Sequence, residues 1–278
     1  MNTKVCYISN FYLGERRVES INQKQDRLLY LKHQILTLSQ HRHNLSKIVF
    51  NFNLREKDIH YINEIIKLTP NQIQSTPVEL IFRENKGMSY GAWSDVFKKY
   101  QNEFDYYIFN EDDYFIHAHD FDQYLVNTFT QYKDCGYLCA VVYEGGNDYP
   151  KHAANCFGIS SFEALNKVYQ KYGRLLGEMD EYTQKHIGGE VHGNGQVAHT
   201  LVFTEFGYDI YDIRESYRVL HSMGTNENNF FEFYFPWNNN HLILPAAAKF
   251  FEPIHYIEKS EEQFSKLGLN NKYLNKLN

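Results

Sequence analysis

Three carboxylates stand side by side directly after a strand-like segment. Glu111, Asp112 and Asp113 follow the largely apolar run at 106–110, which is typical of a buried strand. Adjacent carboxylates repel one another, and either a hard cation or surrounding water relieves that repulsion. Magnesium and manganese ions suit such oxygen ligands and leave coordination positions open for phosphate oxygens. The run therefore indicates a divalent-cation site or, alternatively, a solvated acidic turn before the next helix.

The alternation of side chains along a strand divides the three acids. Successive residues point to opposite faces, so Glu111 and Asp113 would share one side while Asp112 points to the other. We therefore expect Glu111 and Asp113 to act together. The end of a strand is also where open α/β sheets bind their ligands.

The segments before the acids alternate between strand and helix. Candidate strands cover residues 4–10, 47–53 and 77–83. Apolar residues at helical spacing predict helices over roughly 20–40 and 57–68, and a third with apolar positions between 92 and 100. Repeated strand-helix steps favour parallel strands joined by right-handed crossovers. The predicted fold class is therefore α/β, with a Rossmann-like, mainly parallel central sheet flanked by helices.

Polar residues follow each of the first four predicted strands. The carboxyl ends of parallel strands meet at one rim of the sheet, so these residues are expected to converge there into one polar pocket. Glycine in such a loop lets the backbone approach a ligand closely. The residues before the acidic run are Ser9, Asn10, Asn51, Asn53, Asn85 and Gly87.

The second half of the chain continues the same alternation. Asp120 is expected to cap one helix, and Ser160 with Glu163 forms the spacing of a capping box for another. Strands are predicted at 136–143 and 208–213, with a helix over 196–206. No repeat, linker or low-complexity segment divides the chain, so residues 1–278 are interpreted as a single domain.

The composition limits the partners of the protein. Its 278 residues include 28 Lys and Arg against 34 Asp and Glu, a balance that disfavours nucleic acid as a partner. The four cysteines form no C-x-x-C pair, which favours reduced, buried thiols. We expect no signal peptide and no transmembrane segment, and hence a cytoplasmic protein.

The order of these parts resembles the GT-A glycosyltransferases, which use nucleotide sugars. Residues 111–113 stand where that family carries its acidic D-x-D motif, and segment 83–93, with Asn85 and Gly87, is similar to the stretch near the nucleotide. The resemblance covers residues 4–215, and this chain departs from it in having Glu at the first acidic position. It implies a single GT-A-like catalytic domain with a nucleotide-binding half at 1–115, an acceptor-side half at 116–225 and a C-terminal extension at 226–278.

The resemblance also implies a cofactor and a set of metal ligands. Mn²⁺ or Mg²⁺ would stabilise the departing diphosphate of a UDP- or GDP-linked sugar as a Lewis acid. Asp113 is the expected direct ligand, and Glu111 would reach either the metal or the ribose hydroxyls, with Asp112 beside the nucleotide. His221 is the candidate for a ligand from the C-terminal part, although a lone histidine is more often an ordinary surface or core residue.

An inverting transfer needs a base for the acceptor hydroxyl. Glu190, after the pair Gly188 and Gly189, matches by position the late acidic residue that often serves in this family. Alternatively, Glu190 stands in the first turn of a helix, where the helix dipole favours a negative charge. Asp148 is the second candidate for the base. The expected reaction moves a sugar from the nucleotide donor to a glycan or other hydroxyl acceptor.

Two other functions fit the same pattern. A nucleotidyltransferase acting on a sugar phosphate would use a similar sheet and paired acids, but its usual glycine-rich and basic loop is represented only by Gly14, Arg16 and Arg17. A non-catalytic carbohydrate-binding protein would be a third reading. The intact acids favour an enzyme.

Overall fold

The computed structural model describes residues 3–14, 26–112, 115–116, 119–139, 142–143, 150–153, 157–177, 194–212, 219–220, 232–233 and 243–244. Four residues of the predicted site lie outside these ranges, namely Asp113, Asp148, Glu190 and His221.

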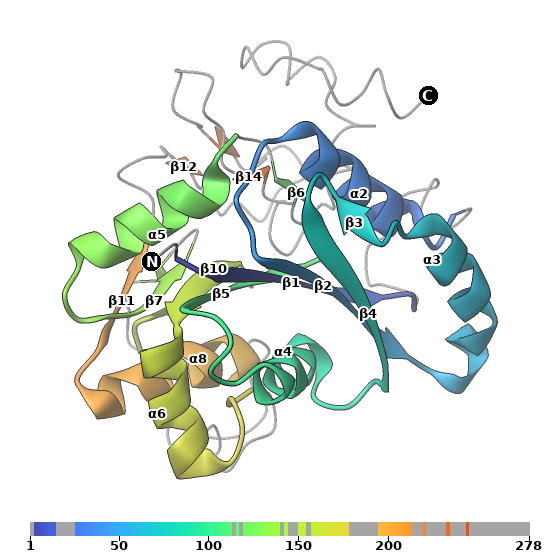
Figure 1. Ribbon diagram of the computed structural model, residues 1–278. Helices are drawn as coiled ribbons and strands as arrows, with labels where there is room; N and C mark the ends of the chain where they lie inside the picture. Colours follow the sequence, from blue (N-terminus) through green and yellow to red (C-terminus); the bar gives the residue numbers. More distant parts are fainter. Residues whose placement is uncertain are drawn as a thin grey trace.

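The helices and strands follow one another in the predicted alternation (Figure 1). The first half contains β1 (Val5–Tyr12), α2 (Leu29–Gln40), β2 (Lys47–Leu54), the 3₁₀ helix η1 (Glu56–Tyr61), α3 (Ile62–Leu68), β3 (Gln72–Ile73), β4 (Thr76–Glu84), α4 (Met88–Lys99), β5 (Tyr106–Glu111) and β6 (Phe115–Ile116). The second half contains α5 (Phe121–Gln131), β7 (Cys135–Cys139), β8 (Val142–Tyr143), β9 (His152–Ala153), β10 (Gly158–Ser161), α6 (Phe162–Tyr172), α8 (Asn194–Leu201), η2 (Val202–Phe206), β11 (Asp209–Asp212), β12 (Val219–Leu220), β13 (Glu232–Phe233) and β14 (Ile243–Leu244).

Within the described residues, eight strands form one central sheet in the order β11-β7-β10-β5-β1-β2-β4-β3. Strands β1, β2, β4 and β5 run parallel, and β11 runs parallel to β7. Strand β10 is antiparallel to both of its neighbours, and β3 is antiparallel to β4. The predicted α/β class with a mainly parallel sheet is therefore confirmed.

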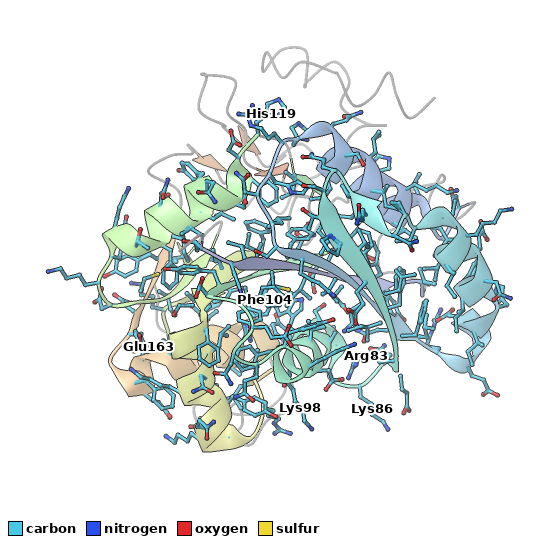
Figure 2. All side chains as sticks on the ribbon, in the orientation of Figure 1. Arg83, Lys86, Lys98, Phe104, His119 and Glu163 are labelled. Carbon is cyan, nitrogen blue, oxygen red and sulfur yellow. The ribbon has the colours of Figure 1, made fainter. Side chains whose placement is uncertain are left out.

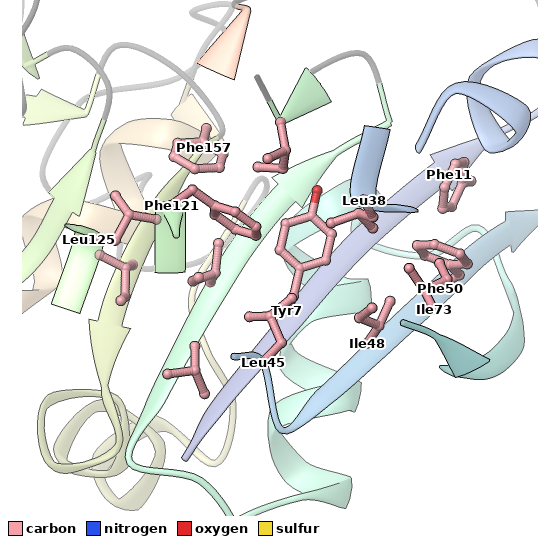
Figure 3. Close-up of a cluster of buried hydrophobic side chains, with 14 of the residues drawn as sticks. Tyr7, Phe11, Leu38, Leu45, Ile48, Phe50, Ile73, Phe121, Leu125 and Phe157 are labelled. Carbon is pink, nitrogen blue, oxygen red and sulfur yellow. The ribbon is translucent and has the colours of Figure 1, made fainter. Parts of the chain in front are cut away.

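Helices cover both faces of the sheet (Figure 1). Helices α2, α3 and α5 lie on one face, and α4, α6 and α8 lie on the other. Each face carries its own hydrophobic core. Figure 3 shows part of the first core, in which Tyr7, Leu38, Ile48, Phe121 and Leu125 pack together. The second contains Ile8, Trp93, Phe97, Phe109 and Leu165.

The residues of β1 show why a central strand is apolar almost throughout. Tyr7 belongs to the first core, whereas Cys6 and Ile8 belong to the second. Because both faces are covered by helices, successive side chains are buried in turn rather than alternating between core and water. The polar exceptions, Ser9 and Asn10, come near the carboxyl end of the strand and lie on opposite faces.

One of the predicted helix starts is misassigned by one residue, and another is correct but lacks the expected side-chain cap. Ser161, not Ser160, caps α6, because its Oγ accepts a hydrogen bond from Ala164 N at 3.2 Å. Ser160 is still part of β10, and its hydroxyl donates to Gly136 O at 2.6 Å. Asp120 does precede α5, but its side chain makes no capping bond there.

The remaining differences concern short elements. The predicted helix over 57–68 begins as the 3₁₀ helix η1 and becomes α-helical only at Ile62. The two-residue strand β3 was not predicted, and the strand predicted at 136–143 is described as β7 and β8.

The described cysteines agree with the expectation of reduced thiols. Cys6, Cys135 and Cys139 are buried and form no disulfide. Cys156 lies outside the described residues. None of the helices in the described part of the chain combines the length and hydrophobicity needed to cross a bilayer.

Candidate functional site

The carboxyl ends of β1, β2, β4 and β5 meet at one rim of the sheet. The register places Asn10 opposite both Asn51 of β2 and Glu111 of β5. Asn53, two residues further along β2, stands opposite Arg83 of β4. Polar residues from separate strands therefore lie next to one another at this rim.

The first turn of α4 brings a serine into this rim. Ser89 donates its hydroxyl hydrogen to Glu111 Oε1, and its Oγ accepts a hydrogen bond from Asn10 Nδ2 at 3.1 Å. Asn10 and Ser89 are buried, whereas Glu111 is partly exposed. Three elements distant in sequence thus hold one carboxylate at the amino end of a helix, where the helix dipole is positive. We call Asn10, Ser89 and Glu111 the rim network.

The loop that leads into α4 and the first turn of the helix each need a glycine. Gly87 has φ of 71° and precedes the helix in the left-handed conformation, which glycine adopts at little cost. A Cβ atom on Gly91 would lie 2.2 Å from Lys86 O, so the loop packs directly on the first turn of α4. Asn85 and Gly87 are both exposed at the rim. Both therefore remain accessible to a ligand.

Asn51 and Asn53 hold α4 in place. Asn51 Nδ2 donates to Ala92 O at 3.2 Å, and Asn53 Nδ2 donates to Met88 O at 3.0 Å. Both side chains are buried, at 0% and 1% exposure. Their amide groups are therefore used to fix the helix, although both were predicted to face the nucleotide.

Arg83 was not predicted, and it ties the same region together (Figure 2). Its Nη1 donates to Asn53 Oδ1 at 2.5 Å, its Nη2 to Lys86 O at 2.8 Å and its Nε to Asp95 Oδ2 at 2.8 Å. The five donors of a guanidinium group suit such a branched junction. Arg83 thereby connects β2, the loop at 84–87 and α4.

Asp112 points into the protein, away from the rim network. Its Oδ2 accepts a hydrogen bond from Tyr12 N at 3.0 Å, and its own backbone N–H donates to Asn10 O at 3.0 Å. The side chain is 3% exposed. Glu111 and Asp112 thus follow the predicted alternation. In this structure Asp112 joins the ends of β1 and β5 rather than facing a ligand.

Ser9 lies on the other face of the sheet from Asn10. It is fully buried, and its Oγ accepts a hydrogen bond from Asn110 Nδ2 at 3.2 Å. Its predicted role beside a nucleotide is therefore not supported by its position. The described members of the predicted site that do share the rim are Asn10, Asn85, Gly87 and Glu111.

A buried histidine lies beneath α4 and carries no charge at neutral pH. His199 of α8 is surrounded by the rings of Tyr90, Trp93, Phe109 and Tyr137, with centroid distances of 5.3 to 5.6 Å. Burial lowers the pKa of His199 to about 4. Its Nδ1 lies 3.1 Å from Leu176 O, so Nδ1 carries the hydrogen.

The metal ligands predicted from sequence are represented in the structure by Glu111 alone. Asp113 and His221 lie outside the described residues, as do the candidate bases Glu190 and Asp148. Among the side chains that the structure places, no group of three His, Cys, Asp or Glu residues is arranged to hold a metal ion. Strand β14 pairs with β6, so residues 243–244 lie beside the segment that follows the acids.

Comparison with known proteins gives remote structural likenesses only. No protein-family model matches the chain, and no curated protein matches it in sequence. A 4-diphosphocytidyl-2C-methyl-D-erythritol synthase from Anaerococcus prevotii DSM 20548 has 10% identity and a TM-score of 0.47, over 76% of this chain and 86% of that chain. A cytidylyltransferase from Leptospira borgpetersenii serovar Hardjo-bovis has 12% identity and a TM-score of 0.45, over 76% of both chains.

The glycosyltransferase GlyE of Streptococcus pneumoniae TIGR4 has 11% identity and a TM-score of 0.45. That alignment covers 77% of this chain and 46% of GlyE. None of these likenesses assigns a reaction to this chain.

Proposed function

We propose that the protein is a metal-dependent glycosyltransferase that moves a sugar from a UDP- or GDP-linked donor to a glycan or another hydroxyl acceptor. The observation that carries this proposal is the rim network. Ser89, which accepts a hydrogen bond from Asn10, donates to the carboxylate of Glu111 at the amino end of α4. The amino end of a helix attracts phosphate groups, whereas a carboxylate beside it repels them. A cation between carboxylate and phosphates resolves that conflict.

The chemistry of the donor atoms supports Mn²⁺ or Mg²⁺. Glu111 offers a carboxylate oxygen at the rim, and hard divalent cations prefer such oxygens while keeping positions open for phosphate. In the proposal, Asp113 supplies a direct ligand and His221 a further one. A bound cation would stabilise the negative charge of the departing diphosphate.

The remaining residues bind and activate the two substrates. Asn85 and Gly87, exposed in the loop before α4, would contact the nucleotide. Glu190 is proposed as the base that takes the proton of the acceptor hydroxyl in an inverting transfer, with Asp148 as the second candidate. A carboxylate serves in this role when it lies on the acceptor side of the sugar.

Metal-dependent stabilisation by a donor tests the proposal directly. A UDP- or GDP-sugar at about 100 times its Kd, with Mn²⁺, should stabilise the fold by about 2.7 kcal/mol, which raises Tm by about 5 °C for a chain of this size. The same sugar nucleotide with EDTA should give no shift. Asp113→Ala should abolish the shift, and Glu111→Gln should reduce it.

Glu103→Gln is the matched control, because Glu103 is exposed in the turn that precedes the amino end of β5. It removes the same charge at the opposite end of the strand and should leave the shift intact. A shift with nucleoside triphosphates but with no sugar nucleotide would indicate a nucleotidyltransferase instead. No shift with either class of ligand would favour a non-catalytic protein.

A further inference from the structure

The outer side of β4 is open along more than half of the strand. On its inner side β4 pairs with β2 along residues 78–84. On its outer side β3 pairs only with Thr76 and Pro77, and Val78 N donates to Asn71 O at 2.9 Å. Within the part of the chain that the structure describes, no strand pairs with the outer side of β4 beyond Val78. Figure 1 shows β4 and β3 at this end of the sheet, with α3 beside them.

The hydrogen bond of Val78 shows which backbone groups face the open side. Successive residues of a strand direct their N–H and C=O groups to opposite sides, so every second residue faces the same neighbour. Because Val78 faces outward, Leu80 and Phe82 also direct their N–H and C=O groups outward, and the residues between them bond to β2. No described segment offers a backbone partner to these two residues.

The open stretch covers residues 79–83. Asn71 covers the edge just before it, and the carbonyl of Glu84, just after it, accepts a hydrogen bond from Lys86 N at 2.8 Å. The middle of the stretch, residues 80–82, is apolar, and all of these side chains are only half-buried. An unprotected strand edge of this kind is a template for pairing with another strand.

We propose that this edge of β4 pairs with the same edge of a second copy of the protein, in the antiparallel direction. The result is a two-fold dimer in which the two central sheets form one continuous sheet. With Ile81 of both copies on the two-fold axis, residues 79–83 of one copy pair with residues 79–83 of the other. Leu80 then lies opposite Phe82 of the second copy, and the two residues exchange both N–H···O=C hydrogen bonds.

The side chains suit this register. Glu79 of one copy lies opposite Arg83 of the other, and Ile81 lies opposite itself, so charges of opposite sign and apolar groups are matched. Such cross-strand pairs stabilise a sheet, whereas like charges in opposite positions destabilise it. Shifting the register by two residues in either direction would bring in Val78 or Glu84, whose backbone groups already have partners.

Exposed apolar side chains lie on the elements that adjoin β4 in the chain. Ile59 of η1, Ile66 of α3 and Met88 of α4 are 54%, 53% and 51% exposed. Antiparallel pairing about an axis normal to the sheet keeps α3 of both copies on the same face. Ile59 and Ile66 are therefore available to extend the contact beyond the paired strands, as apolar side chains do in the core of an interface.

The first test measures the oligomeric state of the full chain by sedimentation at a series of protein concentrations. The wild-type protein is expected to dimerise reversibly. Ile81→Lys places two like charges opposite each other on the axis and should raise the dimer Kd at least about 100-fold. Leu201→Lys is the matched control, because Ile81 and Leu201 are both partly buried side chains packed against the second core. The control should leave the Kd unchanged, and circular dichroism checks that each variant is folded.

A cysteine on the axis tests the register. In an antiparallel pair the two copies of residue 81 have Cα atoms about 4.5 Å apart, within the range of about 4.4 to 6.8 Å that a disulfide spans. Ile81→Cys should therefore form a covalent dimer on mild oxidation. Val78→Cys is the control, because the two copies of residue 78 would be about 20 Å apart at about 3.4 Å per residue. That variant and the wild-type protein should stay uncrosslinked.

Three results would contradict the proposal. A wild-type protein that stays monomeric at every concentration would show that the edge does not pair with itself. A folded Ile81→Lys protein with the wild-type Kd would place the dimer interface elsewhere. Equal crosslinking of Val78→Cys and Ile81→Cys would show random collision rather than paired strands. If Ile81→Lys does not fold, the crosslinking of Ile81→Cys, which keeps a small and weakly polar side chain, decides the question.

Discussion

The carboxylate of Glu79 is predicted to stabilise the fold in a pH-dependent way. Glu79 lies on β4 with a side chain that is 24% exposed, and its Oε2 is 2.7 Å from Lys47 Nζ. Lys99 Nζ and the Tyr100 hydroxyl donate to the same carboxylate. These partners come from β2 and from the last turn and C-cap of α4, so Glu79 joins that end of the helix to the sheet.

The size of the effect follows from the pKa of Glu79. Burial raises this pKa, but hydrogen bonds from Lys47, Lys99 and Tyr100 outweigh burial and lower it from 4.5 to about 2. That difference corresponds to about 3.4 kcal/mol at about 1.36 kcal/mol for each pKa unit. Lys99 is half exposed, and solvent screening reduces the expected contribution to about 1 to 2 kcal/mol.

The direction of the pH dependence is fixed by the sign of the shift. The pKa of Glu79 is lower in the folded protein than its ordinary value of 4.5. The stabilisation is therefore complete well above pH 4.5 and is lost as the pH falls towards 2. By pH 3 it should have fallen to less than half of its value at neutral pH.

Glu79→Gln removes the charge and keeps the shape of the side chain. Urea unfolding followed by fluorescence should show a loss of about 1 to 2 kcal/mol at pH 7, and the gap to wild type should narrow at pH 3. Glu64→Gln is the control, because Glu64 is exposed on α3, and it should change stability by less than about 0.5 kcal/mol. A Glu79→Gln protein as stable as wild type at pH 7, or a gap that does not narrow, would refute the reasoning.

Two further predictions concern α6 and α8. Ser161→Ala should destabilise α6 by about 1 kcal/mol and speed hydrogen exchange at the amide of Ala164. Ser160→Ala should leave that amide protected. The reverse pattern would show that Ser160 is the cap. His199, with a pKa lowered to about 4 by burial, should stay neutral from pH 8 to 5 by NMR of its imidazole ring. A titration near pH 6.5 would instead show that the ring reaches water.

The long strands were predictable because their signal is local. Five of the eight residues of Lys47–Leu54 are apolar, and helices on both faces of the sheet bury every residue of the strand except Lys47. The direction of β10 was not predictable. It lies between β5 and β7 and is antiparallel to both, and strand order depends on contacts between residues far apart in sequence.

The sequence indicated which types of residue would lie at the rim, but it did not indicate the role of each residue. The acidic run indicated Glu111 because adjacent carboxylates repel one another and are tolerated where a cation or water relieves the repulsion. Asn51 and Asn53 were expected to face a ligand, yet both donate to the backbone of α4. The sequence around a single polar residue does not show whether its side chain will hydrogen-bond to a ligand or to the backbone of a helix. Ser89 was missed for the same reason, because its partners at positions 10 and 111 are assembled only by the fold.

The position of Ser89 depends on how both ends of α4 are held. Asn51 and Asn53 donate to carbonyls in its amino-terminal half, and Glu79 binds Lys99 and Tyr100 at its carboxyl end. Sliding or tilting α4 would break these hydrogen bonds. The bond from Asn51 is buried, and a buried polar group that is left unpaired costs about 1 to 3 kcal/mol. In this structure the hydrogen bonds to both ends of α4 thus place the Ser89 hydroxyl beside Glu111. If a cation binds at this rim as proposed, the carboxylate is already held, and binding includes less of the entropy cost of ordering it.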